Sequence, residues 1–470
     1  MRIAAIDQGT TSTRVVLCSD RAPPRLALAE RHAQHYPQAG WVEHDPEELL
    51  ANIRRCLAAA GPVDAIALTN QGESCLAWDG ETGEALSPVI VWQDARTLAA
   101  VEALRAAGHE PEARARSGLG LDPYFSASKL AWLLQSSQEL RRRREQGRLR
   151  LGTTDAWFLQ RLTGRAATDV TTAARTGLMH LGSGQWDPWL CDLYGLPIES
   201  LPPIVPPLAD YGAVDGVPLR SALVDQVAAL YGHGCRKAGD LKITFGTGAF
   251  ALALLDRPTP GGGDGSLLEV AAWPIDGRPA FALDGGVYNA GSAIEWLDRI
   301  GMLRGLDELA SFERAPAIER GLAFVPALSG LACPHFDRRA AGLWIGMGLE
   351  TERGDLLQAA LEGIALRSAE VVAAIESRQP GNGPISIDGG LTGSAYFCSF
   401  LATAVGRPVL VQGFAEMTAF GAAALLADAE GVTLDLGPER ARRVEPGPNG
   451  WAWRQRFAAA RERAQGWRQD

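Results

Sequence analysis

The stretch Asp7-Gln-Gly-Thr-Thr-Ser12 lies between two apolar runs near the start of the chain, residues 2–6 and 13–18. Glycine and hydroxyl residues are typical of tight turns, and short runs rich in β-branched residues are typical of strands. The segment therefore predicts a strand–turn–strand unit whose turn carries one carboxylate, one glycine and three hydroxyl groups.

The same pattern returns about half-way along the 470 residues. Residues 242–245 and 249–255 form two apolar runs around the turn Gly246-Thr-Gly248, and a third glycine turn, Asp388-Gly-Gly390, follows the apolar residues 385–387. A repeat of this kind, in a chain where predicted strands alternate with predicted helices, indicates an α/β fold with two related lobes. We place these lobes at residues 1–234 and 235–470.

Glycine turns that follow strands suit a ligand that carries phosphate groups. Backbone N–H groups can approach phosphate oxygens there, and Thr and Ser hydroxyls supply further donors. Asp7 would repel a bare phosphate, so its useful role beside the turn is to hold Mg²⁺, and an Asx turn is the structural alternative. Neither a GxxxxGK[ST] motif nor a GxGxxG motif follows the first predicted strand, which argues against Walker-type and dinucleotide binding.

The composition narrows the possible partners and compartments. The formal net charge is −10 and 46% of the residues are hydrophobic, which argues against nucleic acid as a partner and against wholesale disorder. No apolar run approaches the roughly 18 residues that span a bilayer, so we expect no membrane association. The seven cysteines form no CxxC pair, as is usual in a reducing compartment. We therefore expect a soluble, cytoplasmic protein.

Several further stretches resemble a known family. They are Gly40-Trp-Val-Glu-His-Asp-Pro46, Thr69-Asn-Gln71 followed by Glu73, Val91-Trp-Gln-Asp94, Asp122-Pro-Tyr-Phe-Ser126 and Phe245-Gly-Thr-Gly248. Together with residues 7–14 they are similar, in order and over nearly the whole chain, to the FGGY carbohydrate kinases, and within that family to its glycerol kinase branch.

The resemblance implies a fold and an activity. The fold would consist of two ribonuclease-H-like lobes, as in the actin/hexokinase/Hsp70-like superfamily, around a central cleft for ATP and substrate. The activity would be transfer of a phosphoryl group from ATP with Mg²⁺ to a terminal hydroxyl of glycerol or a closely related polyol. Members of the family often form homodimers or homotetramers, so the same state is expected here.

The resemblance also assigns roles to individual residues. Asp225 matches the catalytic base, although without the resemblance the sequence favours a helix N-cap at this place. Asp7 matches the metal-binding carboxylate. The positions that match substrate contacts are Gly72, Glu73, Trp92, Tyr124, Asp225, Gln226 and Phe250. The positions that match nucleotide contacts are Thr10, Thr11, Ser12, Arg14, Gly246, Thr247, Gly291, Glu295, Gly390 and Ser394.

The chain departs from the family pattern at four of the positions around the expected site. Gly72 stands where the family has an Arg that donates to a substrate hydroxyl, and Val224 stands where it has a Gly. Glu295 replaces a Gln, and Ser394 replaces an Asn. These changes leave two further interpretations open, a kinase for a longer polyol or ketose and a catalytically weak nucleotide-binding regulator.

The loss of the Arg at position 72 can be compensated in three ways. Water can fill the space beside Gly72, a larger substrate can extend into it, or an Arg from another segment can replace the missing one. Arg96 and Arg175 are the candidates for such a replacement, and the sequence does not decide between them.

Overall fold

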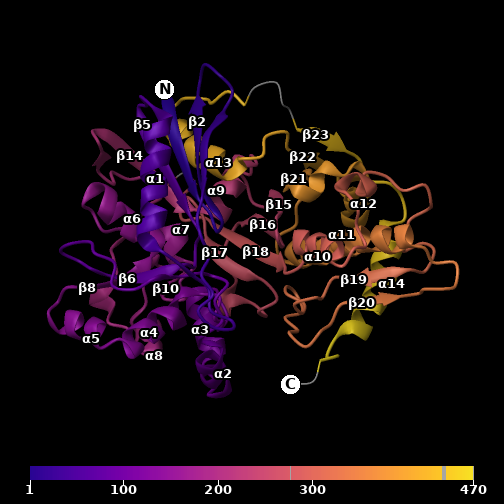
Figure 1. Cartoon of the computed structure of the whole chain (residues 1–470), viewed down its shortest axis with the longest axis horizontal. Helices are drawn as coiled ribbons and strands as arrows, with labels where there is room; N and C mark the ends of the chain where they lie inside the picture. Colours follow the sequence, from indigo (N-terminus) through magenta and orange to yellow (C-terminus); the bar gives the residue numbers. More distant parts are fainter. Residues whose placement is uncertain (276, 437–440, 469–470) are drawn as a thin grey trace.

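Two mixed β-sheets organise the chain, one in each half (Figure 1). The computed structural model describes residues 1–275, 277–436 and 441–468, so small parts of the second predicted lobe, at 276, 437–440 and 469–470, lie outside the described residues. The first sheet has the strand order β13-β14-β5-β1-β2-β3. Its strands are β1 (Arg2–Gln8), β2 (Ser12–Ser19), β3 (Arg25–Arg31), β5 (Ala65–Asn70), β13 (Ala213–Val214) and β14 (Val217–Val224).

The second sheet repeats the topology of the first. Its order is β17-β18-β16-β15-β21-β22-β23. In the first sheet β1, β2 and β3 run antiparallel, and β5 and β14 follow in parallel on the other side of β1. In the second, β15, β16 and β18 run antiparallel, and β21 and β22 follow in parallel beside β15. The strands are β15 (Leu241–Phe245), β16 (Ala249–Leu255), β17 (Leu268–Ala271), β18 (Phe281–Val287), β21 (Ile385–Gly389), β22 (Val409–Val411) and β23 (Arg442–Val444).

This repeat confirms the predicted two-lobed α/β fold. The turn Gly9–Thr11 between β1 and β2 and the turn Gly246–Gly248 between β15 and β16 occupy the same place in their sheets. Each strand of these units shows buried residues on both faces, because helices cover both sides of each sheet. Among the described residues, no helix combines the length and apolar character needed to cross a lipid bilayer.

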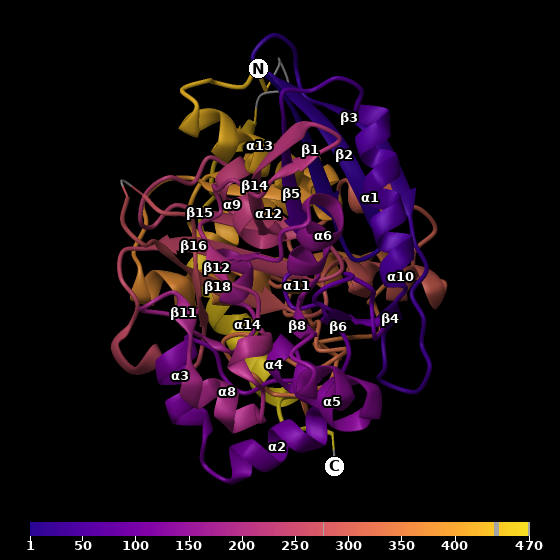
Figure 2. The same ribbon diagram turned by 90° about the vertical axis from the view of Figure 1, so that its left-hand side faces the viewer.

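Two helices from distant parts of the chain cover opposite faces of the first sheet (Figure 2). Helix α1 (Pro46–Ala60) packs on the face that carries Ala4 and Ile6. The Asp45 side chain caps its start by accepting hydrogen bonds from two backbone N–H groups. Helix α13 (Met417–Ala429) comes from the second half of the chain, yet it packs on the other face, against β1 and β5.

Helix α13 also packs closely on α9 (Asp225–Gly232), the helix that follows β14. The two helices meet at Gly232 and Gly421, where their backbones nearly touch. A Cβ on Gly421 would overlap the carbonyl oxygen of Ala228, so glycine is required there by the close approach of the helices. This contact joins the second half of the chain to the helix that carries Asp225.

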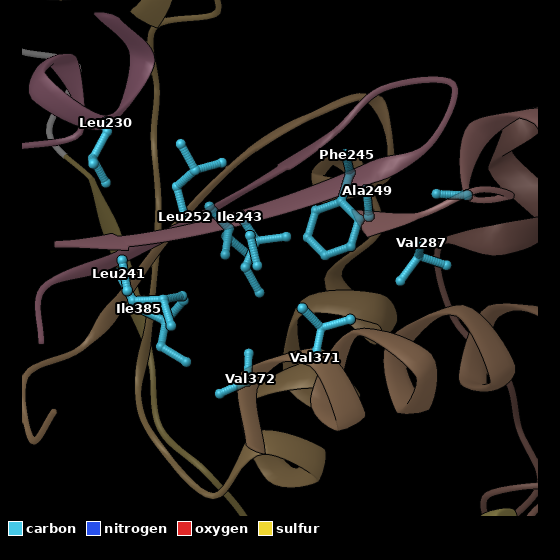
Figure 3. Packing of buried hydrophobic residues seen from close by; sticks show 14 of the residues in the cluster. Leu230, Leu241, Ile243, Phe245, Ala249, Leu252, Val287, Val371, Val372 and Ile385 are labelled. Carbon is cyan, nitrogen blue, oxygen red and sulfur yellow. The ribbon is translucent and has the colours of Figure 1, made fainter. Parts of the chain in front are cut away.

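The core of the second lobe lies between its sheet and α11 (Arg353–Arg378). Figure 3 shows Val371 and Val372 of α11 on the side of the sheet where Ile243 and Ile385 project. The other helices around this core are α10 (Gly291–Arg299), α12 (Ala395–Val405) and α14 (Gly450–Ala464), and a small hairpin is formed by β19 (Ala323–Val325) and β20 (Leu343–Ile345).

A third, four-stranded sheet with the order β4-β7-β6-β8 extends the first lobe. Its strands are β4 (Glu43–His44), β6 (Cys75–Asp79), β7 (Val89–Ile90) and β8 (Leu149–Thr153). The helices of this region and the segment after it are α2 (Leu98–Ala106), α3 (Glu110–Ser117), α4 (Ser126–Ser136), α5 (Gln138–Glu145), α6 (Thr154–Thr163), α7 (Val170–Ala173) and α8 (Pro188–Tyr194). Four short strands complete it as two pairs, β9 (Thr168–Asp169) with β12 (Ile204–Val205) and β10 (Met179–His180) with β11 (Gln185–Trp186).

Candidate active site

Three carboxylates lie at the carboxyl ends of neighbouring strands of the first sheet. Asp7 is near the end of β1, Glu73 follows β5, and Asp225 directly follows β14. These three strands are parallel and adjacent, and Asp7 stands opposite Thr69 in the pairing of β1 with β5. Because the carboxyl ends of parallel strands meet at one edge of a sheet, the fold gathers these acids in one place.

Asp225 is the first residue of α9 and its carboxylate accepts a hydrogen bond of 2.6 Å from the backbone N–H of Gln226. Burial raises the pKa of Asp225 to about 7, and the negative charges of Glu73 and Asp7 act in the same direction. The positive charge of Arg175 and the bond from Gln226 oppose the rise in this pKa. A carboxylate with a pKa near neutrality is well matched to accept a proton from a hydroxyl group.

Arg175 organises the predicted substrate residues. Its Nε donates to Glu73 at 2.6 Å, and its Nη2 donates to the hydroxyl oxygen of Tyr124 at 3.3 Å. Its Nη1 donates to Asp284 on β18, in the second sheet. The ring of Trp92 meets that of Tyr124 edge to face, with 5.7 Å between their centroids. The fold thus brings Glu73, Trp92 and Tyr124 together, as the sequence predicts.

The two candidates for a replacement Arg lie in different surroundings. Arg96 is buried in a separate cluster, where it binds Asp94 and Glu43 and stacks on the rings of Trp41 and Trp132. Arg175 is the one that contacts Glu73 beside Gly72. The neighbourhood of Gly72 is also filled, since a Cβ on it would lie 2.6 Å from a Val224 methyl group and 3.3 Å from Cγ of Arg175.

Asp7 has the surroundings of a cation ligand. It accepts a hydrogen bond of 2.8 Å from the hydroxyl of Thr69. Burial raises its pKa above the ordinary value and the charge of Glu416 adds to the rise, while the bond from Thr69 and the charge of Arg14 oppose it. The charge of Asp7 in turn raises the pKa of Asp225. A divalent cation near these two oxygen-bearing groups would relieve their repulsion, and Mg²⁺ is usually held by one or two carboxylates together with phosphates.

The glycine turns of both sheets are held by specific contacts. In the first turn, the hydroxyl oxygen of Thr10 accepts a hydrogen bond of 2.9 Å from the indole N–H of Trp92. In the second, the carbonyl oxygens of Gly246 and Thr247 accept backbone bonds from the start of α10, including one of 2.9 Å from Gly291. A Cβ on Gly291 would collide with the Gly246 carbonyl, so only glycine allows this approach. The second turn is therefore fixed to the start of α10 by these backbone bonds.

The other predicted nucleotide residues of the first lobe lie on the same hairpin. Thr11 is exposed at its tip, Ser12 begins β2, and Arg14 follows two residues later. Arg14 donates to Glu416 at 2.9 Å, and Glu416 immediately precedes α13. To contact a phosphate, the Arg14 guanidinium would therefore have to leave Glu416 or bind both groups at once.

The predicted nucleotide residues of the second lobe differ in exposure and in whether their side chains already have hydrogen-bond partners. Gly390 starts a short 3-10 turn, and a Cβ built on it would meet open space. Glu295 is exposed on α10. The Ser394 hydroxyl accepts from the N–H of Phe397 at 3.1 Å, as the N-cap of α12, and donates to the carbonyl oxygen of Leu309. The Ser394 hydroxyl is thus already used in hydrogen bonds that stabilise the start of α12.

Gln226 is tied to the second lobe through Lys242. The amine of Lys242 donates to the Gln226 side-chain oxygen at 2.8 Å and to the Thr244 hydroxyl at 3.1 Å. Burial lowers the pKa of Lys242, while the charges of Asp388 and other carboxylates nearby oppose that effect. Phe250 pairs with Thr244 across the sheet, on β16. Gln226 therefore lies on α9 and Phe250 on the second sheet, with Lys242 and Thr244 between them in this chain of contacts.

Three residues of this site were missed in the sequence. Asp284 binds Arg175, Lys242 holds Gln226, and Glu416 holds Arg14. Asp284 and Lys242 each interrupt an otherwise apolar strand, which is the signal that could have marked them, because a charge in a buried strand needs a partner. Glu416 shows no such signal, since it lies in a loop.

Comparison with known proteins agrees with this geometry. A model of the N-terminal domain of the FGGY family of carbohydrate kinases matches residues 2–232, and a model of the C-terminal domain matches residues 241–430. The chain belongs to the FGGY family of carbohydrate kinases. The family and the phosphotransferase class predicted from the sequence are thereby confirmed, whereas the roles of single residues in this FGGY kinase stay predictions.

Individual relatives and solved structures are also similar to this FGGY kinase. The glycerol kinase of Alkalilimnicola ehrlichii is 41% identical over 449 residues, 92% of this chain and 90% of the relative. That of Thermus brockianus is 42% identical over 439 residues, 90% of this chain and 88% of the relative. The crystal structure of Plasmodium falciparum glycerol kinase with ADP gives a TM-score of 0.89 at 27% identity, covering 98% of both chains. The fold is shared by the xylulose kinase from Lactobacillus acidophilus. Its structure gives a TM-score of 0.86 at 21% identity, covering 98% of this chain and 97% of that one.

The raised pKa of Asp225 gives a direct spectroscopic prediction. In the ligand-free protein labelled with ¹³C at Asp carboxyl groups, one resonance that is lost in Asp225→Asn should titrate with a midpoint near pH 7. The carboxylate form is the one able to accept a proton, so kcat/KM for ATP should rise with pH through this range. If the resonance removed by Asp225→Asn titrates near pH 4, the raised pKa and its role in the rate profile are both wrong.

Proposed function

We propose that this FGGY kinase transfers the γ-phosphoryl group of ATP to a terminal hydroxyl of glycerol or a closely related polyol. The observation that supports this most is the meeting of Asp225 and Glu73, which follow adjacent strands, with Tyr124 and Arg175. The glycerol kinases of Alkalilimnicola ehrlichii and Thermus brockianus, at 41% and 42% identity, support the same substrate.

The side chains around Asp225 suit a neutral substrate that offers hydroxyl groups. One carboxylate oxygen of Glu73 accepts the bond from Arg175, so the other oxygen can accept a hydrogen bond from a substrate hydroxyl. Tyr124 accepts from Arg175, so its own O–H can donate to the substrate. Glu73, Asp225 and Asp284 put three carboxyl groups around Arg175, so an acidic sugar would meet more negative than positive charge.

Phosphoryl transfer asks the protein mainly for orientation and for control of charge and water. We propose that Asp225 orients the attacking hydroxyl and accepts its proton late in the transfer. The turns that carry Thr10, Thr11 and Ser12, and Gly246 and Thr247, would offer backbone N–H groups and hydroxyls to the phosphates, with Arg14 beside them. The nucleoside would be contacted by Gly291, Glu295 and Gly390. Ser394 would act indirectly, by orienting the start of α12.

We propose that Asp7 holds Mg²⁺, together with the phosphate oxygens of the nucleotide. Mg²⁺ would supply neutralisation of the charge on the phosphate oxygens. Thr69 would keep Asp7 in position through its hydrogen bond to the carboxylate. A cytoplasmic location is proposed as well, because all seven cysteines are free and buried, as is usual in a reducing compartment. A homodimer or homotetramer remains a proposal from the family resemblance alone.

A longer polyol or a ketose is the second candidate substrate. The xylulose kinase from Brucella ovis, at 26% identity and a TM-score of 0.84, is the observation that favours it. The packing beside Gly72 disfavours it, since Val224 and Arg175 occupy the space that extra carbons would need on that side. The regulator interpretation is disfavoured because Asp7, Asp225 and both glycine turns are present and assembled.

A substrate panel tests these alternatives. Turnover with ATP and Mg²⁺ should be measured on glycerol, erythritol, ribitol, xylulose and gluconate, with Asp225→Asn as a control for contaminating kinases. We expect glycerol to have the highest kcat/KM and gluconate to react far more slowly. A tenfold preference for a five-carbon substrate would overturn the proposed substrate, and no turnover of any compound would overturn the kinase function.

A further inference from the structure

Two of the positions where this chain departs from the pattern of its family touch each other. A Cβ on Gly72 would lie 2.6 Å from Cγ2 of Val224, closer than carbon atoms pack, and 3.3 and 3.6 Å from Cγ and Cβ of Arg175. The φ angle of Gly72 lies outside the left-handed region, so its lack of a side chain is required by packing and not by backbone conformation. With Val224 in place, no larger residue fits at position 72 without displacing its neighbours.

Val224 is itself firmly placed. It is 1% exposed, and its backbone has φ −65° and ψ 144°, an ordinary extended conformation that any residue adopts. Its N–H donates to the hydroxyl of Thr171 at 3.0 Å. The expected Gly at this position is therefore not needed for the backbone. Val224 also directly precedes Asp225, so its packing bears on the predicted base.

Arg175 is buried, and its guanidinium is fixed by three hydrogen bonds. It is 1% exposed, and all three of its guanidinium nitrogens donate, to Glu73, to Tyr124 and to Asp284. Glu73 and Tyr124 belong to the first lobe, whereas Asp284 belongs to the second sheet. The aliphatic part of Arg175 lies against the position where a Gly72 side chain would begin.

We propose that Gly72, Val224 and Arg175 form one matched specificity unit, a conclusion that rests on the proposed function. Gly72 leaves room for Val224 and for the stem of Arg175. Arg175 then acts as a positioning residue, which turns one oxygen of Glu73 and the O–H of Tyr124 toward the substrate. Val224 closes the wall beside them, so the unit fits a short polyol and excludes carbons beyond the third on that side.

A double-mutant cycle tests the match between positions 72 and 224. Gly72→Ala alone should raise the KM for glycerol at least tenfold and lower Tm, because the new methyl group displaces Val224 and Arg175. Val224→Gly added to Gly72→Ala should bring KM back to within about threefold and recover part of the lost Tm. The same repair is expected when Gly72→Arg is combined with Val224→Gly. The KM for ATP should stay within about twofold throughout.

The outcomes of the cycle separate the inference from the proposed function. Additive effects of the two substitutions on both KM and Tm would overturn the matched pair. Coupling in Tm with unchanged KM for glycerol in every variant would overturn its role in specificity. Absence of turnover on any polyol by the unmodified chain would instead refute the proposed function, while the packing of the pair would still be read from Tm, which needs no substrate.

Arg175→Lys tests the positioning role, with Arg96→Lys as the matched control. Both arginines are buried and bind two carboxylates, so both changes should lower Tm. Lysine keeps the charge but loses the fork that reaches three partners. Only Arg175→Lys should raise the KM for glycerol, by roughly tenfold to 100-fold, without a change in the KM for ATP. Equal effects of the two variants on the KM for glycerol would overturn the positioning role.

Discussion

Asp225→Asn is expected to lower kcat by roughly 10²–10⁴-fold, the usual size of a general-base effect. The change removes the proton acceptor but keeps the shape of the side chain, and the amide oxygen can still accept the bond from the N–H of Gln226. The KM values for glycerol and ATP should change much less than kcat. Steady-state kinetics with purified protein give all three numbers.

The same variant should not be less stable at pH 8. The pKa of Asp225 in the folded protein, about 7, is above its ordinary value, so the folded state binds a proton more tightly than the unfolded chain. The charged carboxylate therefore weakens the folded state above pH 7, and this cost fades as pH falls. Asp225→Asn should raise Tm at pH 8 and have a smaller effect at pH 5.

A control variant separates chemistry from general damage. Asp192→Asn makes the same change on an exposed residue of α8 and should leave both kcat and Tm unchanged. If Asp225→Asn retains kcat within a few-fold of the unmodified protein, Asp225 has no role as a base. A large loss of Tm at pH 8 would show that the carboxylate stabilises the fold, contrary to its raised pKa.

Asp7→Ala is expected to abolish Mg²⁺-dependent turnover while the fold survives. Asp7 is partly accessible and ends a strand in a polar turn, so its removal leaves no apolar cavity. A metal that neutralises phosphate charge contributes several kcal/mol in the transition state, so more than a 100-fold loss is expected. The Mg²⁺ dependence of the rate and the rise in Tm caused by ADP with Mg²⁺ measure the effect.

Asp7→Asn refines this test. The amide oxygen can still accept the hydrogen bond of Thr69, so the local structure is kept while the charge is lost. We expect Asp7→Asn to need far more Mg²⁺ for turnover and to show little extra Tm from Mg²⁺ over ADP alone. Normal activity of either variant at an ordinary Mg²⁺ concentration would show that Asp7 is not the metal ligand.

Local features of the sequence predicted the framework of the site well. A carboxylate or glycine turn placed directly after an apolar run is decided by neighbouring residues, because strands and turns depend on local spacing. The β1–β2 and β15–β16 units were predicted for this reason. The order of the parallel strands in the folded sheet then brings Asp7, Glu73 and Asp225 to one edge.

Contacts between distant segments could not be predicted in this way. The sequence left both Arg96 and Arg175 as candidates, and only the packing shows that Arg96 is enclosed by Trp41 and Trp132. Ser394 caps α12 through the nearby N–H of Phe397, but nothing local indicates its second bond, to the carbonyl oxygen of Leu309, 85 residues away. Position in a motif therefore does not establish which side chains remain free to bind a ligand.

The sequence by itself determined the two-lobed fold, the family and the residue types available for phosphoryl transfer, because these follow from local patterns. Only the tertiary structure decided how those residues act. Arg175 meets Glu73 across 102 residues and Asp284 across 109, and Val224 meets Gly72 across 152. The raised pKa of Asp225 depends on the same folding, since burial and the charges of Glu73 and Asp7 arise only when the strand ends come together.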